Sequence, residues 1–495
     1  MKLLHIAHFF PGVQLLPAIV PLCHALVAQP NIYEVDVAII GGGLAGLSAA
    51  KDLAAANKTF AILEARDRVG GRVLNAELPG EHAEELGAEY VGPTQDRVLA
   101  LAAALGLPTY KTYTVGQSTF YRNGTVRHYQ DQLGGVPPVP INSLVELALF
   151  MNDINTLASK VDLEAPWKTP NATVLDSMTL ETYINSKLST PDSRALLDIA
   201  IPAILSTEVK EPSLLYALWC IAAAGDETGP GTINRLIGVD GGAQDSRIQG
   251  GSQLLAIKLA EKLGSQKIIL NTPVRKVKRE KGKYTITADT GIISARYVIV
   301  AMSPPLVSRI IFEPPLPAGR DQLNQRMPMG SIGKAIAIFP RPWWRGQGLN
   351  GAGVSDTGVI RVTYDNTPAD ASFGALMGFI EADEMRKLDT ASEEEVKRQV
   401  KQSFTNLFGP RVETATDILI QRWDLEEFSR GGPGAFMPPG VLTQYGSHLR
   451  APVGGIHFAG TETSLRWIGY MDGAIASGER VAGEILSSCF DCGFH

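Results

Sequence analysis

Residues 34–73 constrain the fold more than any other part of the chain. An apolar run at 35–40 leads into Gly41, Gly43 and Gly46, at the spacing G-x-G-x-x-G. The first glycine permits a tight strand-to-helix turn, the second lets backbone approach a pyrophosphate, and the third lets helix and strand pack closely. A helical stretch and a second apolar run then end in Glu64, which can accept a hydrogen bond from a ribose hydroxyl. Together these features predict a dinucleotide site at the start of a Rossmann-type fold.

The residues that follow this acid indicate which dinucleotide binds. Arg66, Gly70, Gly71 and Arg72 form the segment R-D-R-V-G-G-R. This continuation resembles the FAD-binding flavoprotein amine oxidases, in which a second Gly-Gly-Arg segment contacts the FAD pyrophosphate. The resemblance implies FAD as cofactor, with Arg66, Gly71 and Arg72 among its ligands.

Length and composition exclude several other classes of protein. A chain of 495 residues is too long for one ordinary domain. The net charge of −6, without a basic stripe, argues against nucleic acid as a partner. The eight histidines have no metal-binding spacing, so no metal is expected. The sequence has no G-x-S-x-G motif either, so no serine nucleophile of that kind competes. Cys489 and Cys492 form an isolated C-x-x-C, which favours a terminal disulfide or two free thiols over zinc.

The N-terminal residues 1–28 have the outline of a secretory signal, although prolines and histidines interrupt it. Three N-x-T sequons, at Asn57, Asn123 and Asn171, agree with secretion. The alternative is an N-terminal arm on a soluble intracellular enzyme. No later stretch is long and apolar enough for a membrane anchor, so none is expected.

The fold class expected is α/β, with a Rossmann-type FAD-binding domain and an α+β second domain of mixed sheet and helices. After an arm at 1–33, the FAD-binding domain is assigned to residues 34–108, 230–305 and 427–488. The substrate-binding domain is assigned to residues 109–229 and 306–426.

Several local elements follow from hydrophobic periodicity. A helix is expected at 94–105, with Thr94 as its N-cap. Another is expected at 175–188. Residues 292–293 are expected to close a hairpin, separate from an apolar strand at 297–302.

Near the C-terminus, a strand at 456–459 runs into Gly460-Thr461-Glu462, and a helix begins near Met471. This segment resembles the part of monoamine oxidases that closes over FAD, so the resemblance spans residues 35–486. It implies that Gly460 and Glu462 meet the ribityl-pyrophosphate, and that Tyr470 and Met471 lie against the flavin ring. The same resemblance assigns further residues to the cofactor: Gly87, Ala88, Glu89 and Tyr90 beside the flavin, Val274 at the adenine end, and Trp423.

Lys334 lies in an apolar strand, where an unpaired ammonium would be costly to bury. Its position matches the lysine that, in flavin amine oxidases, holds a water near flavin N5 and is linked to reoxidation by O₂. The alternative is a lysine that reaches solvent from the end of a strand.

Trp467 and Tyr470 are expected at the substrate, with Tyr470 as one wall of the aromatic cage that monoamine oxidases place before the flavin. At the place of the second cage wall, either Gly434 or Phe436 would face the cage. Pro433 stands where that family carries its flavin-attaching cysteine, which predicts non-covalent FAD.

The predicted function is FAD-dependent oxidative deamination of an amine to an imine and then an aldehyde, with O₂ reduced to H₂O₂. The residues beside the flavin include no arginine to bind a carboxylate, and Glu89 would repel one, which favours amines over amino acids. The alternatives are an oxidase or desaturase of a specialised metabolite, a polyamine oxidase, or a non-catalytic flavoprotein that binds a partner. The expected partners are a small amine and O₂, and a homodimer is left open.

Overall fold

The computed structural model describes residues 32–488 except 81 and 131–134. The signal-like segment and the C-x-x-C pair therefore lie outside the described residues. Cys220, which is described, is a buried free thiol.

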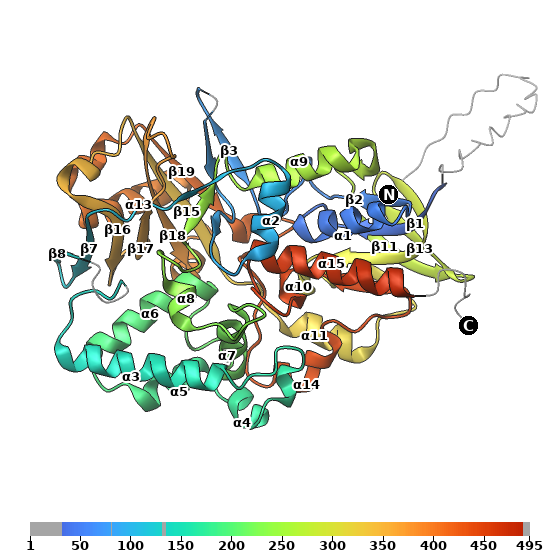
Figure 1. Ribbon diagram of the computed structural model, residues 1–495, viewed down its shortest axis with the longest axis horizontal. Coiled ribbons are helices and arrows are strands. Elements are labelled where there is room, and N and C mark those ends of the chain that lie inside the picture. The colour runs from blue at the N-terminus through green and yellow to red at the C-terminus, as the bar shows by residue number, and fades with distance from the viewer. Residues whose placement is uncertain (1–31, 81, 131–134, 489–495) are drawn as a thin grey trace, which may run out of the picture. The chain divides into compact units, whose positions relative to one another are not determined.

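A mainly parallel sheet carries the dinucleotide motif (Figure 1). Its central strand β1 (Ile32–Ile40) is parallel to β2 (Phe60–Leu63) on one side and to β13 (Gly291–Ala301) on the other. Beyond β2 lies β10 (Ile268–Ile269), and β20 (Ile456–Ala459) pairs with the second half of β13. The strands predicted at 60–63 and 456–459 are confirmed.

The expected break before residue 297 is wrong. β13 is a single strand of 11 residues, and its ladder with β1 is continuous from Ile292 to Val300. Its first half pairs antiparallel with β12 (Lys283–Ala288), which is followed in the sheet by β11 (Val274–Glu280) and β14 (Ile311–Glu313). The polar residues between the two apolar runs alternate with buried ones, because successive side chains of a strand point to opposite faces.

Helices α1 (Leu44–Ala55), α9 (Gln253–Leu263), α2 (Asp96–Ala104) and α15 (Met471–Ser487) share one core with this sheet (Figure 1). α1 and α15 approach closely at Gly478. A Cβ added there would lie 2.2 Å from the Ala45 carbonyl oxygen. The two halves of the dinucleotide-binding region, more than 400 residues apart in sequence, therefore depend on a glycine contact.

Gly478→Ala should lower the free energy of unfolding by about 1–3 kcal/mol, because backbone would have to move to make room for the methyl group. Gly483→Ala, in the same helix, is the matched control, since nothing lies within 4 Å of its Cβ position. That substitution should raise stability by about 0.5–1 kcal/mol through helix propensity. Denaturant unfolding measures both, and equal effects of the two substitutions would contradict this packing.

The expected N-cap of α2 is wrong. Thr94 has a φ of +70°, and the helix begins two residues later. The Asp472 carboxylate, from the first turn of α15, accepts the N–H groups of Arg97 and Val98 at 2.8 and 3.0 Å instead. Burial raises the pKa of Asp472 to about 6. A side chain from a distant segment thus performs the capping that local sequence assigned to Thr94.

A second, seven-stranded sheet has the order β19-β15-β18-β17-β16-β7-β8. Its strands are β7 (Gln117–Arg122), β8 (Thr125–Tyr129), β15 (Ile332–Phe339), β16 (Leu349–Ser355), β17 (Val362–Asp365), β18 (Gly374–Glu381) and β19 (Asp417–Arg422). Ala335, Ala337 and Phe339 of β15 pack in the core of α13 (Glu393–Phe408). The alternate residues Ile336 and Ile338 face the opposite way, toward Leu86 and Tyr90.

A helical block packs on the second sheet near β7 and β16 (Figure 1). It consists of α3 (Ile141–Ala158), α4 (Ala172–Ser177), α5 (Leu180–Lys187), α6 (Pro191–Leu205), α7 (Leu214–Ala223) and α8 (Ile233–Ile237). The single helix expected at 175–188 is wrong, because Thr179 is extended and its hydroxyl caps α5 at the Thr182 N–H. Four further helices are α10 (Pro304–Val307), α11 (Ala318–Arg326), α12 (Ala382–Lys387) and α14 (Val441–Tyr445).

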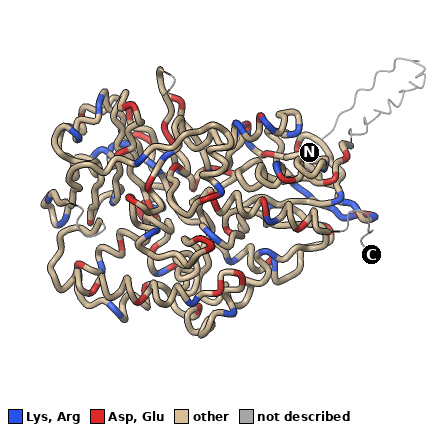
Figure 2. The backbone as a smooth tube through the Cα atoms, in the orientation of Figure 1, with Lys and Arg blue, Asp and Glu red and all other residues tan. Residues whose placement is uncertain are grey.

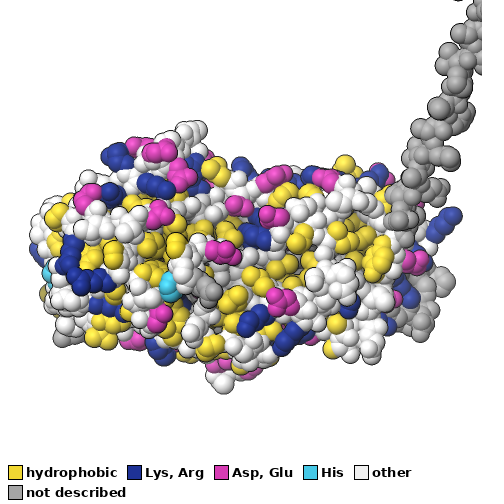
Figure 3. Space-filling model, turned by 90° about the horizontal axis from the view of Figure 1, so that it is seen from above, with side chains coloured by type: hydrophobic (Ala, Val, Ile, Leu, Met, Phe, Trp, Pro, Cys, Tyr) yellow, Lys and Arg dark blue, Asp and Glu magenta, His cyan; other side chains and the backbone are white. Residues whose placement is uncertain are grey.

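Two small sheets complete the described chain. β3 (Asn75–Leu78) pairs with β4 (His82–Glu85), and β9 (Ser246–Ile248) lies between β5 (Tyr90–Val91) and β6 (Thr109–Lys111). Acidic and basic residues are interspersed along the chain (Figure 2), and the face in Figure 3 shows apolar patches between charged side chains. None of the helices within the described ranges combines the length and apolarity that a bilayer span needs.

Candidate active site

The glycine-rich turn between β1 and α1 lines part of a cavity of 340 Å³, which residues of both large sheets and of the helical block also line. Gly41 has a φ of +108°, and a Cβ there would lie 2.6 Å from the Ala301 carbonyl oxygen. Gly43, the N-cap of α1, leaves the first N–H groups of the helix free of any side-chain cap. Gly46 lies behind the cavity, where a Cβ would meet the Gly41 carbonyl oxygen at 2.0 Å. The three glycines thus match the roles expected of the motif.

Glu64 lines the cavity at the end of β2. Its two carboxylate oxygens accept the backbone N–H groups of Gly42 at 2.6 Å and Arg66 at 2.9 Å. These bonds fix the carboxylate beside the glycine turn. The remaining lone pairs of both oxygens can accept hydrogen bonds from a ligand in the cavity.

The segment after Glu64 is joined to the C-terminal part of the chain. Arg72 donates to both oxygens of Glu462, at 2.7 and 3.1 Å, and to the Pro433 carbonyl oxygen at 2.6 Å. Arg66 donates to the Ser429 hydroxyl at 2.9 Å. Both arginines also line the cavity.

Glu462 does not line the cavity, contrary to the expectation that it meets the cofactor. It is buried beneath Arg72, and it also accepts bonds from the Ser303 hydroxyl and the Ala435 N–H. Burial opposes its ionisation, but the Arg72 guanidinium outweighs burial and lowers the pKa of Glu462. Glu462 therefore holds the arginine in place.

Lys334 lies on the face of β15 that carries Ile336 and Ile338, and its ammonium reaches the cavity wall. The ammonium donates to the Glu85 carbonyl at 2.7 Å, to the Gly87 carbonyl at 2.9 Å and to Glu89 Oε2 at 2.7 Å. It is only 2% exposed, so it does not reach solvent from the strand end. A buried, fully hydrogen-bonded cation therefore borders the cavity.

One end of the cavity is aromatic. Tyr216, Tyr364, Phe379 and Tyr470 line it, and we call it the aromatic end. The rings of Tyr364 and Phe379 are 6.4 Å apart. Burial, together with nearby Cys220, raises the pKa of Tyr470.

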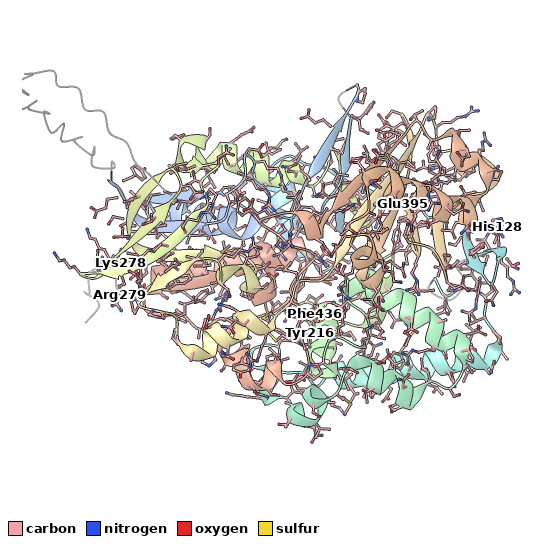
Figure 4. The ribbon with its side chains drawn as sticks, turned by 180° about the vertical axis from the view of Figure 1, so that it is seen from behind. His128, Tyr216, Lys278, Arg279, Glu395 and Phe436 are labelled. Atoms are coloured by element: carbon pink, nitrogen blue, oxygen red, sulfur yellow. The ribbon has the colours of Figure 1, made fainter. Side chains whose placement is uncertain are left out.

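Two residues expected at the substrate do not line the cavity. Trp467 is buried behind Tyr470, with the two rings edge to face at 5.0 Å, and its indole N–H donates to the Thr94 carbonyl. Phe436 points into the helical core near Tyr216, whose hydroxyl donates to the Ala435 carbonyl at 3.1 Å (Figure 4). Gly434, the alternative named for the second cage wall, does line the cavity and carries no side chain.

The other predicted site residues lie on the cavity lining: Gly71, Gly87, Ala88, Glu89, Tyr90, Val274, Trp423, Gly460 and Met471. Sequence reasoning missed the aromatic-end residues Tyr216, Tyr364 and Phe379, together with Gln244. No local motif marks these residues, which come from a helix, two strands and a loop.

The lining fits FAD. One part offers a glycine turn, uncapped helix N–H groups, an acid and two arginines, which suit a ribose and a pyrophosphate. The other part ends at Lys334 and the aromatic end, where the Gln244 Oε1 and Ser206 Oγ atoms are buried without a partner among the described residues. In the part of the chain that the structure describes, no group of three His, Cys, Asp or Glu side chains is placed to hold a metal ion.

Comparisons with known proteins agree with this site. Residues 44–486 match the family of flavin containing amine oxidoreductases. AofH of Mycobacterium tuberculosis, assigned to the flavin-containing monoamine oxidases, is 38% identical over 455 residues, 92% of this chain and 97% of that protein. The human flavin-containing amine oxidase B is 35% identical over 458 residues, 91% of this chain and 86% of that protein.

A solved structure of putrescine oxidase with bound putrescine superimposes with a TM-score of 0.87 at 31% identity. It covers 92% of this chain and 100% of that one. The predicted α/β fold with a second domain, the FAD cofactor and the amine oxidase activity are thereby confirmed. The chain belongs to the flavin-containing amine oxidoreductase family, the FAD-dependent amine oxidases.

Proposed function

We propose that the chain oxidises a primary monoamine with an apolar remainder to the aldehyde, with O₂ as electron acceptor. The balanced reaction consumes one amine, one O₂ and one water, and yields one aldehyde, one ammonia and one H₂O₂. The observation that carries this proposal is the juxtaposition of Lys334 with the aromatic end on one cavity wall. FAD, when bound, accepts the hydride equivalent from the carbon next to the amine nitrogen and passes electrons to O₂.

The lining residues act by positioning and by excluding water. Arg66, Arg72 and the N-terminus of α1 would hold the pyrophosphate, and Glu64 the ribose. The ring of Tyr470 would orient the amine and the C–H bond that breaks. The ammonium of Lys334, fixed by Glu89, would stabilise negative charge that develops beside it.

The lining of the aromatic end supports an apolar monoamine. Ile204, Leu205, Leu236, Ile332 and Ile468 supply apolar surface there. The acidic residues on the described lining are Glu64, Glu89 and Glu427. The first is bonded to backbone beside the glycine turn and the second to Lys334. The putrescine oxidase neighbour makes a diamine the second candidate, but Glu89, the acid beside Lys334, is already paired and so is not free to bind a second ammonium.

Peroxide release across a panel of amines tests the proposal. Aliphatic and aryl-alkyl monoamines should each yield one H₂O₂ per aldehyde formed. If no amine yields peroxide, an oxidase or desaturase of another metabolite, or a non-catalytic flavoprotein, would replace it.

We also propose that FAD is held without a covalent bond, since Pro433 supplies no thiol to the flavin. Acid precipitation of the purified protein should leave essentially all of the yellow chromophore in the supernatant. Retention of the chromophore in the washed pellet would contradict non-covalent binding.

The domain borders and the cellular compartment are also proposals. Residues 34–108, 230–305 and 427–488 are proposed as the FAD-binding domain, because most strands of the parallel sheet come from them. We also propose secretion, for which the three sequon asparagines, Asn57, Asn123 and Asn171, are exposed and so accessible to glycosylation.

A further inference from the structure

Three glutamates and two cations are buried together behind the cavity wall that carries Lys334. Glu84, Glu85 and Glu89 are at most 2% exposed, and so are Arg247 and Lys334. Carboxyl groups outnumber cations in this cluster by one. An uncompensated charge in a dry interior is costly, so such a cluster favours holding a proton.

Two of the three carboxylates have a cation of their own. Glu85 accepts from Arg247 Nε at 2.9 Å and also from Arg247 Nη2, and its second oxygen accepts from the Ser252 hydroxyl at 3.1 Å. Glu89 accepts from Lys334 at 2.7 Å. Each of these two carboxylates therefore has an opposite charge at hydrogen-bond distance, and the pKa of Glu85 is raised by burial against the opposing effect of Arg247.

Glu84 is placed differently. Its Oε2 atom accepts from the Asn366 side-chain amide at 2.6 Å, and the Arg247 Nη2 atom, already bonded to Glu85, lies 3.7 Å away. Its Oε1 atom finds no partner among the described residues. Burial raises the pKa of Glu84 to about 8, against the opposing effect of Arg247 and with smaller raising effects from Glu85 and Glu89.

The Asn366 amide connects this carboxyl to the cavity wall. Its nitrogen is 2.6 Å from Glu84 and 3.3 Å from Glu89 Oε2, which is the oxygen bonded to Lys334. The Asn366 carbonyl accepts from Arg247 Nη1 at 2.5 Å, which fixes its backbone. The state of Glu84 is therefore transmitted through one side chain to the Glu89–Lys334 pair.

We propose that Glu84 carries a proton in the resting enzyme and is a positioning residue for Lys334, acting through Asn366 and Glu89. With this proton in place, the three carboxyl groups and the two cations of the cluster carry no net charge. The Asn366 side-chain amide can then donate to Glu89 as well as to Glu84. Loss of the proton puts a negative charge on Glu84, close to Glu89, Glu85 and Arg247. The guanidinium of Arg247 also lies over the ring of Tyr110. That charge opposes the arrival of electrons at a flavin held beside Lys334.

Infrared titration of the resting holoenzyme tests the proton directly. The wild-type protein should show a carboxylic-acid C=O band that is lost between about pH 6 and pH 10. Glu84→Gln should remove that band. Glu381→Gln is the matched control, because Glu381 is also buried, burial also raises its pKa to about 8, and neither of its oxygens has a partner in the described chain. It should remove a second band and leave the first.

The wild-type protein alone shows whether a titrating carboxylic-acid band exists. Absence of any titrating band in the wild type, or survival of both bands in Glu84→Gln, would overturn the assignment.

The effect on Lys334 rests on the proposed function and has its own readout. We expect the limiting rate constant of flavin bleaching at saturating amine to fall between pH 7 and pH 9. The fall should be about tenfold larger in the wild type than in Glu84→Gln, because titration of one group changes its protonated fraction by a factor near ten over this range. Ionisation of the bound amine is common to both proteins and cancels. Glu381→Gln measures the separate effect of the second buried carboxyl, whose charge acts on Tyr364, and should retain the tenfold fall that Glu84→Gln loses.

Identical pH dependence in the wild type and Glu84→Gln would overturn the positioning role. If no amine bleaches the flavin, the proposed function fails, while the infrared titration still decides the protonation of Glu84.

Discussion

Lys334→Met should slow the reaction of the reduced enzyme with O₂ by about a hundredfold or more. The ammonium is a buried, pre-positioned cation on the cavity wall, and loss of one such charge-stabilising group commonly costs two to three orders of magnitude in rate. Flavin reduction by the amine should also slow, because that step too delivers electrons to a flavin held beside this cation. Stopped-flow mixing of the amine-reduced enzyme with oxygenated buffer measures the reaction with O₂ separately from flavin reduction.

The substitution also leaves the buried Glu89 carboxylate without its cation, and the resulting loss of stability must be separated from the effect on reoxidation. Glu89 would lose its 2.7 Å partner and remain buried, which costs about 3–5 kcal/mol of stability. In the double variant Lys334→Met/Glu89→Gln, much of that stability should return while reoxidation stays slow. Recovery of fast reoxidation in the double variant would show that Lys334 acts only by neutralising Glu89.

Apolar monoamines should exceed diamines of the same length in kcat/KM by about a hundredfold or more. A diamine that places one nitrogen at the flavin carries its second ammonium into the aromatic end, where the acid on the described lining, Glu89, is already paired with Lys334. Burying a charge without a partner costs several kcal/mol, and each 1.4 kcal/mol is about a factor of ten. Steady-state peroxide assays with matched pairs of amines measure the ratio.

Gln244→Glu places an unpaired carboxylate of the same size on the cavity lining. The Gln244 Oε1 atom is buried without a partner among the described residues, and its Nε2 atom donates to the Leu236 carbonyl at 3.1 Å, a bond that the carboxylate loses. The preference for monoamines should shrink by at least about tenfold in this variant. A wild-type enzyme that already prefers diamines would contradict the apolar assignment, and the putrescine oxidase neighbour would then be the better guide.

The parts of the site that depend on local chain geometry could be predicted from sequence. Gly41, Gly43 and Gly46 specify their roles by spacing alone, because each role is a backbone requirement within one strand–turn–helix unit. Lys334 stood out because a charged residue in an apolar strand demands a buried partner. The structure supplies that partner in Glu89.

Sequence reasoning failed for residues whose place in the site depends on the direction in which the side chain points. Phe436 and Trp467 both lie next to lining residues, yet both point into the core, where Trp467 supports Tyr470. Arg247 could not be assigned either, since its segment reads as a glycine-rich loop. It meets Glu84 and Glu85 only because β9 and β4 converge there. Contacts between distant segments leave no periodic signal in either one.

Anaerobic mixing of the purified yellow enzyme with an apolar primary amine shows whether an amine alone reduces the bound flavin. We expect the amine to bleach the flavin without light, and O₂ to restore the colour with one H₂O₂ per flavin. If light and an artificial donor bleach the flavin but no amine does, the chain is not an amine oxidase of this kind.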